Sequence, residues 1–258
     1  MSNKRNLFVV IDLGNSAATY GVYAGTKLEA SGYVVNNSIP KLVNSMNKNG
    51  ALVHSDSVIV SSVVPDLTLK LVESLSRFIP KTKVYIVGRT VKLKIPMHYD
   101  YRSLGSDRLV NIYGAIKRYK LPILIIDFGT AITFDYVSKR GVFEGGLIVP
   151  GVKLSADVLA EKTALLPKLK EIKSVRSLVG RNTKEAMCSG LLNGFGALSD
   201  GLIERFRKQY GAKFRVLVTG GFAVKIAPYA KHFDDVDPLH TIRSLALIYQ
   251  NEIEKKKD

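Results

Sequence analysis

Two stretches of this chain place an aspartate, a glycine and a polar side chain at the end of a buried strand. Residues 8–16 read FVVIDLGNS, and residues 123–130 read ILIIDFGT. An apolar run bounded by glycine predicts a buried strand, and the glycine permits a tight reversal into a second strand. The aspartate at the strand exit can hold a cation or its water, while turn amides and a hydroxyl can hold phosphate.

The two hairpins therefore predict a nucleotide cleft, with one hairpin on each side of the phosphates. An ordinary turn would explain a single copy equally well, and the repetition in the same strand context favours phosphate binding. The candidate phosphate ligands are Asp12, Gly14, Asn15 and Ser16 in the first turn and Asp127, Gly129 and Thr130 in the second. The DFG tripeptide at 127–129 does not indicate a protein kinase, because the sequence has no HRD loop, no GxGxxG loop before a VAxK strand and no P-loop.

The elements that must position these turns follow an α/β pattern. Strands are expected at 7–12, 18–24, 28–35, 57–63, 83–87, within the hairpin 123–137, and at 142–148 and 214–219. Helices are expected at 39–47, 65–78, 105–119, 151–163, 183–209 (interrupted by glycines), 223–229 and 239–254, with an irregular connection at 91–103. The order βββαβα recurs, so we expect two domains, 1–117 and 118–258.

Composition indicates a globular chain of 258 residues, 46% hydrophobic and 23% charged. Cys188 is the one cysteine, which excludes an internal disulfide, and the four histidines lack zinc spacing. No apolar stretch is long enough to cross a bilayer, and Asp12 interrupts the N-terminal apolar run too early for a signal peptide, so we expect a cytoplasmic protein.

The net charge of +16 would attract polyanions. Nucleic acid is one candidate, but the lysines are dispersed and form no stripe with aromatic residues. A positive field suits equally an enzyme that takes ATP and an anionic second substrate, and we favour that interpretation over nucleic-acid binding.

Six motifs occur in an order that resembles one family. They read DLGNS at 12–16, LGSDRxxN at 104–111, DFGTAxTxD at 127–135, GGxIxPG at 145–151, GRNT at 180–183 and TGG at 219–221. Together they resemble the type III pantothenate kinases of the actin-like ATPase superfamily. Ser16 stands where the family usually has Thr, and the approach to Gly105 reads HYDYR, where relatives more often show Tyr followed by a step containing Pro.

The resemblance implies a duplicated ribonuclease H-like fold, with two βββαβα domains facing across a nucleotide cleft. It implies ATP-dependent phosphorylation of pantothenate to 4'-phosphopantothenate, the first step of coenzyme A biosynthesis, by a homodimer. The alternatives are a non-catalytic accessory transcription regulator of the same fold and another small-molecule kinase of the superfamily. The two Asp-x-Gly turns together with Asp107 argue for catalysis, and the 105–108 motif argues for pantothenate.

Within the substrate motif, the resemblance makes Asp107 the general base toward the primary hydroxyl of pantothenate; without it, N-capping of the following helix would be preferred. Arg108 would bind the pantothenate carboxylate, with a surface or dimer salt bridge as the alternative. Asn111 shares a face with Asp107, where a structural hydrogen bond is nearly as good an explanation. The remaining substrate contacts implied are Gly105, Ser106 and either Tyr99 or Tyr101.

The resemblance also implies a Mg²⁺ ion oriented by Asp12 and Asp127 through water. It implies a monovalent cation, K⁺ or NH₄⁺, on Asp135, which could instead be a strand residue facing solvent.

Gly220 and Gly221 would let the backbone approach adenosine, although a plain turn explains them almost as well. Thr183 would reach pantothenate across the dimer interface, or else cap the helix that follows it. The glycines at 145–146 and the Pro150-Gly151 step would shape a loop near the cleft.

Overall fold

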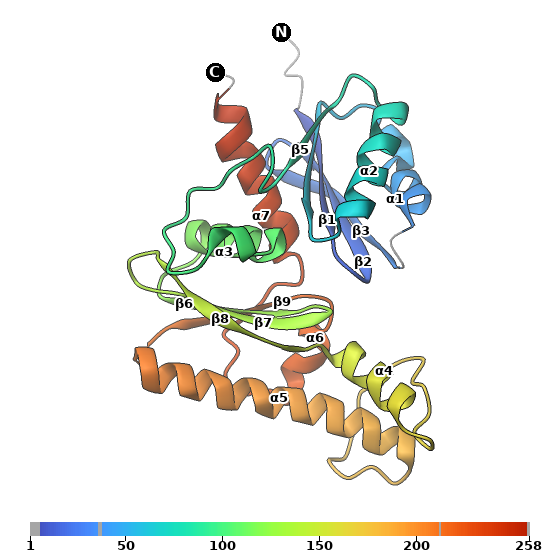
Figure 1. The fold of residues 1–258 in the computed structure, drawn as a ribbon, viewed down its shortest axis with the longest axis vertical. Coiled ribbons are helices and arrows are strands. Elements are labelled where there is room, and N and C mark those ends of the chain that lie inside the picture. The colour runs from blue at the N-terminus through green and yellow to red at the C-terminus, as the bar shows by residue number, and fades with distance from the viewer. Residues whose placement is uncertain (1–5, 36–37, 212, 257–258) are drawn as a thin grey trace. The chain divides into compact units, whose positions relative to one another are not determined.

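The computed structural model describes residues 6–35, 38–211 and 213–256, and its strands form two five-stranded sheets (Figure 1). The first sheet contains β1 (Leu7–Leu13), β2 (Ala17–Ala24), β3 (Lys27–Val35), β4 (Ser57–Ser62) and β5 (Lys83–Ile86). The second contains β6 (Ile123–Phe128), β7 (Ala131–Val137), β8 (Phe143–Pro150), β9 (Arg215–Thr219) and β10 (Asp235–Val236). The short strand β10 is absent from the sequence-based prediction.

The two sheets repeat one topology. Their orders are β3-β2-β1-β4-β5 and β8-β7-β6-β9-β10 when both are read from the outer hairpin strand. In each sheet the first strand is antiparallel to the second and parallel to the fourth. The duplicated α/β order predicted from the sequence is therefore confirmed.

Helices connect the strands at nearly the predicted positions. They are α1 (Ile39–Met46), α2 (Pro65–Phe78), α3 (Ser106–Arg118), α4 (Val152–Lys162), α5 (Thr183–Tyr210), α6 (Ala223–Ile226) and α7 (His240–Ile248). Short 3₁₀ turns are η1 (Lys48–Gly50), η2 (Tyr101–Ser103), η3 (Ala227–Tyr229) and η5 (Glu254–Lys256), and η4 (Tyr249–Ile253) is a π-helical segment that continues α7. Within the described ranges no helix is both long and apolar enough to cross a membrane.

The glycines of α5 do not interrupt it, contrary to the prediction. Gly190 and Gly194 are exposed with open space where a side chain would stand, and each lowers helix stability by about 1 kcal/mol. Gly196 packs so closely that an added Cβ would lie 2.0 Å from the Tyr229 carbonyl oxygen. Burial of Leu192 and Ile203 in the core offsets the low helix propensity of the glycines.

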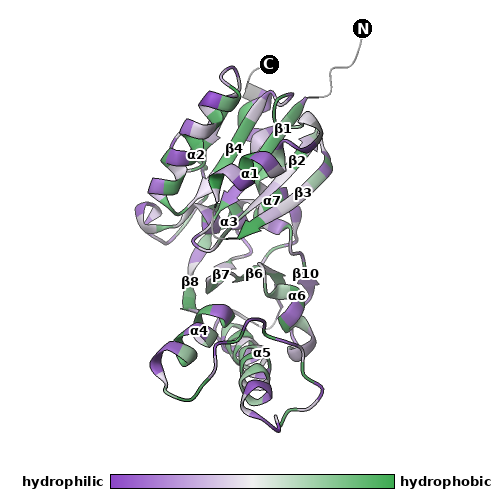
Figure 2. Cartoon of the chain, turned by 90° about the vertical axis from the view of Figure 1, so that its right-hand side faces the viewer, coloured by the Kyte–Doolittle hydropathy of each residue, from purple (hydrophilic) through white to green (hydrophobic). Residues whose placement is uncertain are grey.

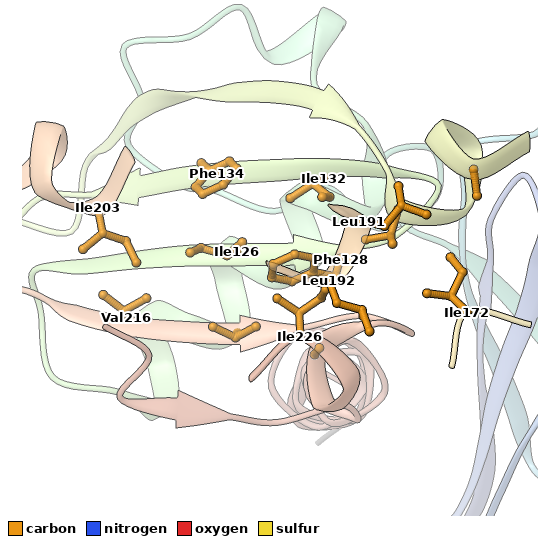
Figure 3. Packing of buried hydrophobic residues seen from close by; sticks show 14 of the residues in the cluster. Ile126, Phe128, Ile132, Phe134, Ile172, Leu191, Leu192, Ile203, Val216 and Ile226 are labelled. Carbon is orange, nitrogen blue, oxygen red and sulfur yellow. The ribbon is translucent and has the colours of Figure 1, made fainter. Parts of the chain in front are cut away.

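The core of the second sheet lies on the face packed toward α5 and α6 (Figure 3). Alternate residues of three strands point to it: Leu124, Ile126 and Phe128 of β6, Ile132 and Phe134 of β7, and Val216 and Val218 of β9. Since successive side chains of a strand alternate between faces, Asp127 and its neighbours in register point to the opposite face.

The chain divides into two compact units. Unit 1 comprises the described parts of Met1–Ile95, Asp100–Arg118 and His240–Asp258, and unit 2 comprises Pro96–Tyr99 and Tyr119–Leu239. The sequence-based division at residue 117 places the C-terminal helix in the second domain, whereas the contacts place it in unit 1.

The helix α7 joins unit 1 because it packs on α3. The Nε2 atom of His240 lies 2.9 Å from the backbone oxygen of Asn111. Gly114 permits the close approach, since an added Cβ would stand 1.8 Å from Ser244 Oγ. These are contacts between segments more than 120 residues apart, and local sequence patterns do not report them.

The helices of unit 1 are amphipathic, with polar stripes visible on α2 beside the apolar strands β1 and β4 (Figure 2). Leu71 and Leu75 of α2 are fully buried. The burial of these leucines holds α2 against the first sheet. Asp12 lies near the end of β1 in that sheet, and α2 follows the end of β4.

Candidate active site

The first Asp-x-Gly turn joins β1 to β2 in unit 1. Asp12 is partly buried near the end of β1, in register with Thr19 on β2 and Ser61 on β4. The Gly14 amide donates to the Ala17 carbonyl at 3.1 Å and closes the turn. Asn15 and Ser16 are exposed at its tip, where their amides and side chains can meet a phosphate.

Asp107 lies in the first turn of α3, also in unit 1. The helix begins at Ser106, so Asp107 is inside the helix and is not its N-cap. Its Oδ1 accepts the Arg108 amide at 2.7 Å. Gly105 makes room for the carboxylate, because an added Cβ would stand 2.5 Å from Asp107 Oδ1.

Burial sets the proton affinity of Asp107. Desolvation raises the pKa of this carboxyl above its ordinary value of 3.8, and the Arg108 amide and guanidinium offset part of that rise. A raised pKa makes Asp107 a stronger base than an exposed aspartate, which suits proton abstraction from a hydroxyl.

Ser106 docks the start of α3 onto the end of β4. Its hydroxyl donates to the Ser62 carbonyl at 2.8 Å and accepts the Ser62 amide at 2.9 Å. Ser61 Oγ lies 3.2 Å from the same hydroxyl. These hydrogen bonds anchor the start of the helix that carries Asp107.

Sequence reasoning missed Ser61 and Ser62. The available signal was a pair of hydroxyl residues at the exit of the 57–63 strand, parallel to the strand that ends at Asp12. Residues at the carboxyl ends of neighbouring parallel strands meet at one edge of a sheet.

Arg108 and Asn111 are buried, with exposed fractions of 6% and 1%. A surface salt bridge for Arg108 is therefore wrong. Asn111 makes the structural hydrogen bond considered as its alternative, accepting from the Thr241 hydroxyl at 2.8 Å. This contact ties the helix of Asp107 to α7.

The two candidate tyrosines lie in different units. Tyr99 belongs to unit 2, where its ring contacts Phe143 at a centroid distance of 5.4 Å. Its segment runs beside β8, with the Phe143 amide donating to the Pro96 carbonyl at 2.9 Å. Tyr101 is 37% exposed and belongs to unit 1, as Asp107 does.

The second Asp-x-Gly turn joins β6 to β7 in unit 2. Asp127 is partly buried and stands in register with Thr133 on β7 and Thr219 on β9. Gly129 and Thr130 are exposed at the turn. The Gly151 amide donates a hydrogen bond to the Thr130 carbonyl at 3.0 Å. Only glycine fits at position 151, because an added Cβ would lie 2.2 Å from that carbonyl oxygen.

Gly220 and Gly221 differ in their surroundings. Gly220 has a φ of +92°, and an added Cβ would stand 2.4 Å from Asp127 Oδ1 and 2.6 Å from the Phe128 backbone. Gly221 has open space at the same position. The protein's own packing therefore requires glycine at position 220. At Gly221 the space is open, so the backbone there is accessible to a ligand.

Asp135 is 1% exposed on β7, so the alternative of a solvent-facing strand residue is wrong. It stands in register with Ile125 on β6 and Gly146 on β8. A buried carboxylate is stabilised by hydrogen bonds or by positive charge, and a bound cation is one source of such charge.

Thr183 does not cap the helix that follows. The cap of α5 is Asn182, whose side chain accepts the Glu185 amide at 3.0 Å, while Glu185 Oε2 accepts the Arg181 amide at 2.9 Å. Thr183 is exposed. It is therefore left available for a contact outside its own helix.

Each turn carries one aspartate, a residue type that can ligate a divalent metal. No group of three or more His, Cys, Asp or Glu side chains that could hold a metal occurs in the part of the chain described. Mg²⁺ in kinase sites uses one or two carboxylates and completes its shell with phosphate oxygens and water. Asp12 and Asp127 are each carboxylates of this kind.

A duplicated sheet with an Asp-x-Gly hairpin in each copy defines a protein of the actin-like, ribonuclease H-like ATPase fold. The fold is shared with the activator of 2-hydroxyisocaproyl-CoA dehydratase from Clostridium difficile, solved with bound ADPNP, with a TM-score of 0.56, 12% identity and 97% of each chain covered. It is shared also with a conserved candidate Baf family transcriptional activator from Campylobacter jejuni, with a TM-score of 0.54, 18% identity, and 96% of this chain and 98% of that one covered. At such identities these likenesses concern the fold alone.

The family model for type III pantothenate kinase matches residues 8–205. The type III pantothenate kinase of Citrifermentans bemidjiense is 35% identical over 253 residues, covering 95% of this chain and 99% of the relative. That of Brevibacillus brevis is 36% identical over 253 residues, covering 95% and 98%. The chain belongs to the type III pantothenate kinase family, and its reaction is the ATP-dependent phosphorylation of pantothenate for coenzyme A biosynthesis, supported by a divalent metal.

Proposed function

We propose that Asp107 is the general base of this reaction. The observation that carries the proposal is a carboxylate in the first turn of α3, given space by Gly105, with a pKa raised by burial. The pantothenate hydroxyl oxygen forms a bond to the γ-phosphorus of ATP, and the bond from that phosphorus to the β–γ bridging oxygen breaks. The hydroxyl proton passes to Asp107, and ADP leaves with the bridging oxygen.

The two turns hold the phosphates in this proposal. Asn15, Ser16 and Thr130 are exposed at the turn tips and offer donors to phosphate oxygens. Asp12 and Asp127 orient Mg²⁺ through its water. Held there, Mg²⁺ would supply neutralisation of phosphate charge.

Substrate recognition is assigned to residues near Asp107. Tyr101 is the better of the two tyrosines, because it is exposed and lies in the same unit as the base. Arg108 would pair with the pantothenate carboxylate in a buried, two-pronged contact, which is stronger away from water. The backbone at 105–106 lines the approach.

Asp135 is the proposed ligand of a monovalent cation. Its burial supports this assignment, because a cation would stabilise the ionised carboxylate. K⁺ and NH₄⁺ have similar size, and either would be expected to support activity better than Na⁺.

A homodimer is the proposed assembly, acting in the cytoplasm. Large apolar side chains are exposed in unit 2, including Leu165 at 91%, Leu178 at 72% and Val179 at 72%. Burying these side chains against a second subunit would remove apolar surface from water, which favours association. Thr183, four residues beyond Val179, would then reach pantothenate bound to the partner subunit.

Light scattering tests the assembly. Val179→Asp is expected to yield monomer, whereas Leu69→Asp, at an exposed position of α2 (58%), should leave the dimer intact. A monomeric wild-type protein would contradict the proposal.

The reaction is tested by mass spectrometry of 4'-phosphopantothenate formed from pantothenate, ATP, Mg²⁺ and K⁺. The wild type should form product, and Asp107→Asn should form at least about 100-fold less while still binding ATP. Near-normal turnover by a folded Asp107→Asn protein would remove Asp107 as the base.

A further inference from the structure

The hydroxyl of Thr219 is buried without a partner. The residue has an exposed fraction of 0%, and among the described residues its Oγ1 has no hydrogen-bond partner. Buried hydroxyls are nearly always satisfied in native proteins, because an unsatisfied one loses its bonds to water and gains nothing in return. An exception next to a ligand site points to a partner that arrives with the ligand.

Thr219 stands beside Asp127. The two residues are in register on the parallel strands β9 and β6, and Asp127 is in register with Thr133 on β7. Their neighbours Val218 and Phe128 belong to the core that faces α5, so all three polar side chains lie on the opposite face. The result is a row of hydroxyl, carboxylate and hydroxyl across three adjacent strands.

The first sheet has a matching arrangement. Ser61 on β4 is in register with Asp12 on β1, as Thr219 on β9 is with Asp127 on β6. The Ser61 hydroxyl has a protein partner, Ser106 Oγ at 3.2 Å. The duplication therefore includes a hydroxyl beside each aspartate, and only the copy in unit 2 has no protein partner among the residues described.

We propose that the Thr219 hydroxyl donates a hydrogen bond to an oxygen of the magnesium–nucleotide complex held at Asp127. That oxygen belongs to a phosphate or to a water on the metal. Thr219 is thus a ligand-contacting residue, separate from the backbone role of the two glycines that follow it. The inference rests on the proposed placement of the metal and phosphates at Asp127.

Thr219→Val tests the proposal, because valine keeps the shape of the side chain and removes the hydroxyl. Ser57→Ala is the matched control. Ser57 also has a buried hydroxyl without a partner, but it lies at the other end of β4, in register with Phe8 and four residues before Ser61. Both variants remove an unsatisfied hydroxyl, and only one removes it beside an aspartate of the site.

Calorimetric titration with ADP measures binding, with Mg²⁺ and again with EDTA. Thr219→Val should bind ADP and Mg²⁺ about tenfold more weakly than the wild type, the loss expected for one hydrogen bond to a charged group. A loss that persists in EDTA assigns the hydroxyl to a phosphate oxygen, and a loss confined to Mg²⁺ assigns it to water on the metal. Ser57→Ala should bind as the wild type does.

Thermal unfolding without ligand separates this role from a structural one. The Tm of Thr219→Val should equal that of the wild type or exceed it by about 2 °C, since the change removes an unsatisfied group. A Tm several degrees lower, or unchanged nucleotide affinity, would overturn the inference. Wild-type affinity in Asp127→Asn would instead overturn the placement of the metal and phosphates, and with it that part of the proposed function.

Discussion

Replacing Gly220 with alanine should damage both the stability of unit 2 and the position of Asp127. The φ of +92° is unfavourable for a residue with a side chain, at a cost of about 1–3 kcal/mol. The new Cβ would stand 2.4 Å from Asp127 Oδ1 and 2.6 Å from Phe128 backbone atoms, and relieving such crowding costs about 1–3 kcal/mol more. The expected total is about 4 kcal/mol, which lowers Tm by roughly 8–16 °C for a protein of this size.

Gly221→Ala is the matched control, because its Cβ meets nothing within 4 Å. Its Tm should stay within about 2 °C of the wild type. Differential scanning calorimetry on both variants measures the contrast. A Gly220→Ala protein as stable as Gly221→Ala would refute the argument from close packing.

Kinetics at a temperature where both variants are folded extends the same test. Gly220→Ala must move Asp127 or the Phe128 backbone, so kcat should fall at least about tenfold. Gly221→Ala should keep kcat and raise KM for ATP if adenosine contacts the backbone there. Equal kinetic effects of the two changes would contradict the separate roles assigned to these glycines.

Three further outcomes are expected. Asp107→Asn should raise Tm at pH 7.5. The pKa of Asp107 is above 3.8 in the folded protein, so its contribution to the stability of the wild type is full below pH 3.8 and is lost as the pH rises through the folded-state pKa. The higher Tm of Asp107→Asn should therefore disappear when both proteins are unfolded below pH 3.8. Replacing K⁺ by Na⁺ should sharply reduce turnover in the wild type, and equal rates would undercut the cation assignment of Asp135. Gly114→Ala should lose about 1–3 kcal/mol in chemical denaturation, since its Cβ would stand 1.8 Å from Ser244 Oγ, whereas Gly190→Ala in open space should gain up to about 1 kcal/mol.

The parts of the fold that sequence predicted well are those determined locally. Apolar runs ending in Asp-x-Gly predicted both hairpins, because burial and a glycine turn leave few other conformations. The exposed positions of Asn15, Ser16 and Thr130 at the turn tips follow from the same hairpin pattern. The family resemblance, rather than any pattern, directed attention to Asp107.

The parts that sequence did not predict depend on distant contacts. The C-terminal helix joins unit 1 through Asn111 and Gly114, more than 120 residues earlier in the chain. The hydrogen bonds between the Ser106 hydroxyl and the backbone of Ser62, 44 residues earlier, were likewise not predicted. The alternative that Thr183 caps α5 was wrong, because the N-cap is the preceding residue, Asn182. Asparagine and threonine are both common N-caps, and the backbone conformation determines which of the two residues takes that position.

The hydroxyls in register with the two aspartates have different surroundings in the two sheets. A hydroxyl beside the strand-exit aspartate becomes visible only when strand order and register are known, since Ser61 and Thr219 share no sequence motif. In unit 1 this hydroxyl contacts Ser106, at the start of the helix that carries Asp107. In unit 2 the residue after Thr219 is Gly220, and the Thr219 hydroxyl has no hydrogen-bond partner in the described chain. By our proposals, one position of a repeated sheet thus supports the helix that carries the base in one copy and contacts the nucleotide in the other.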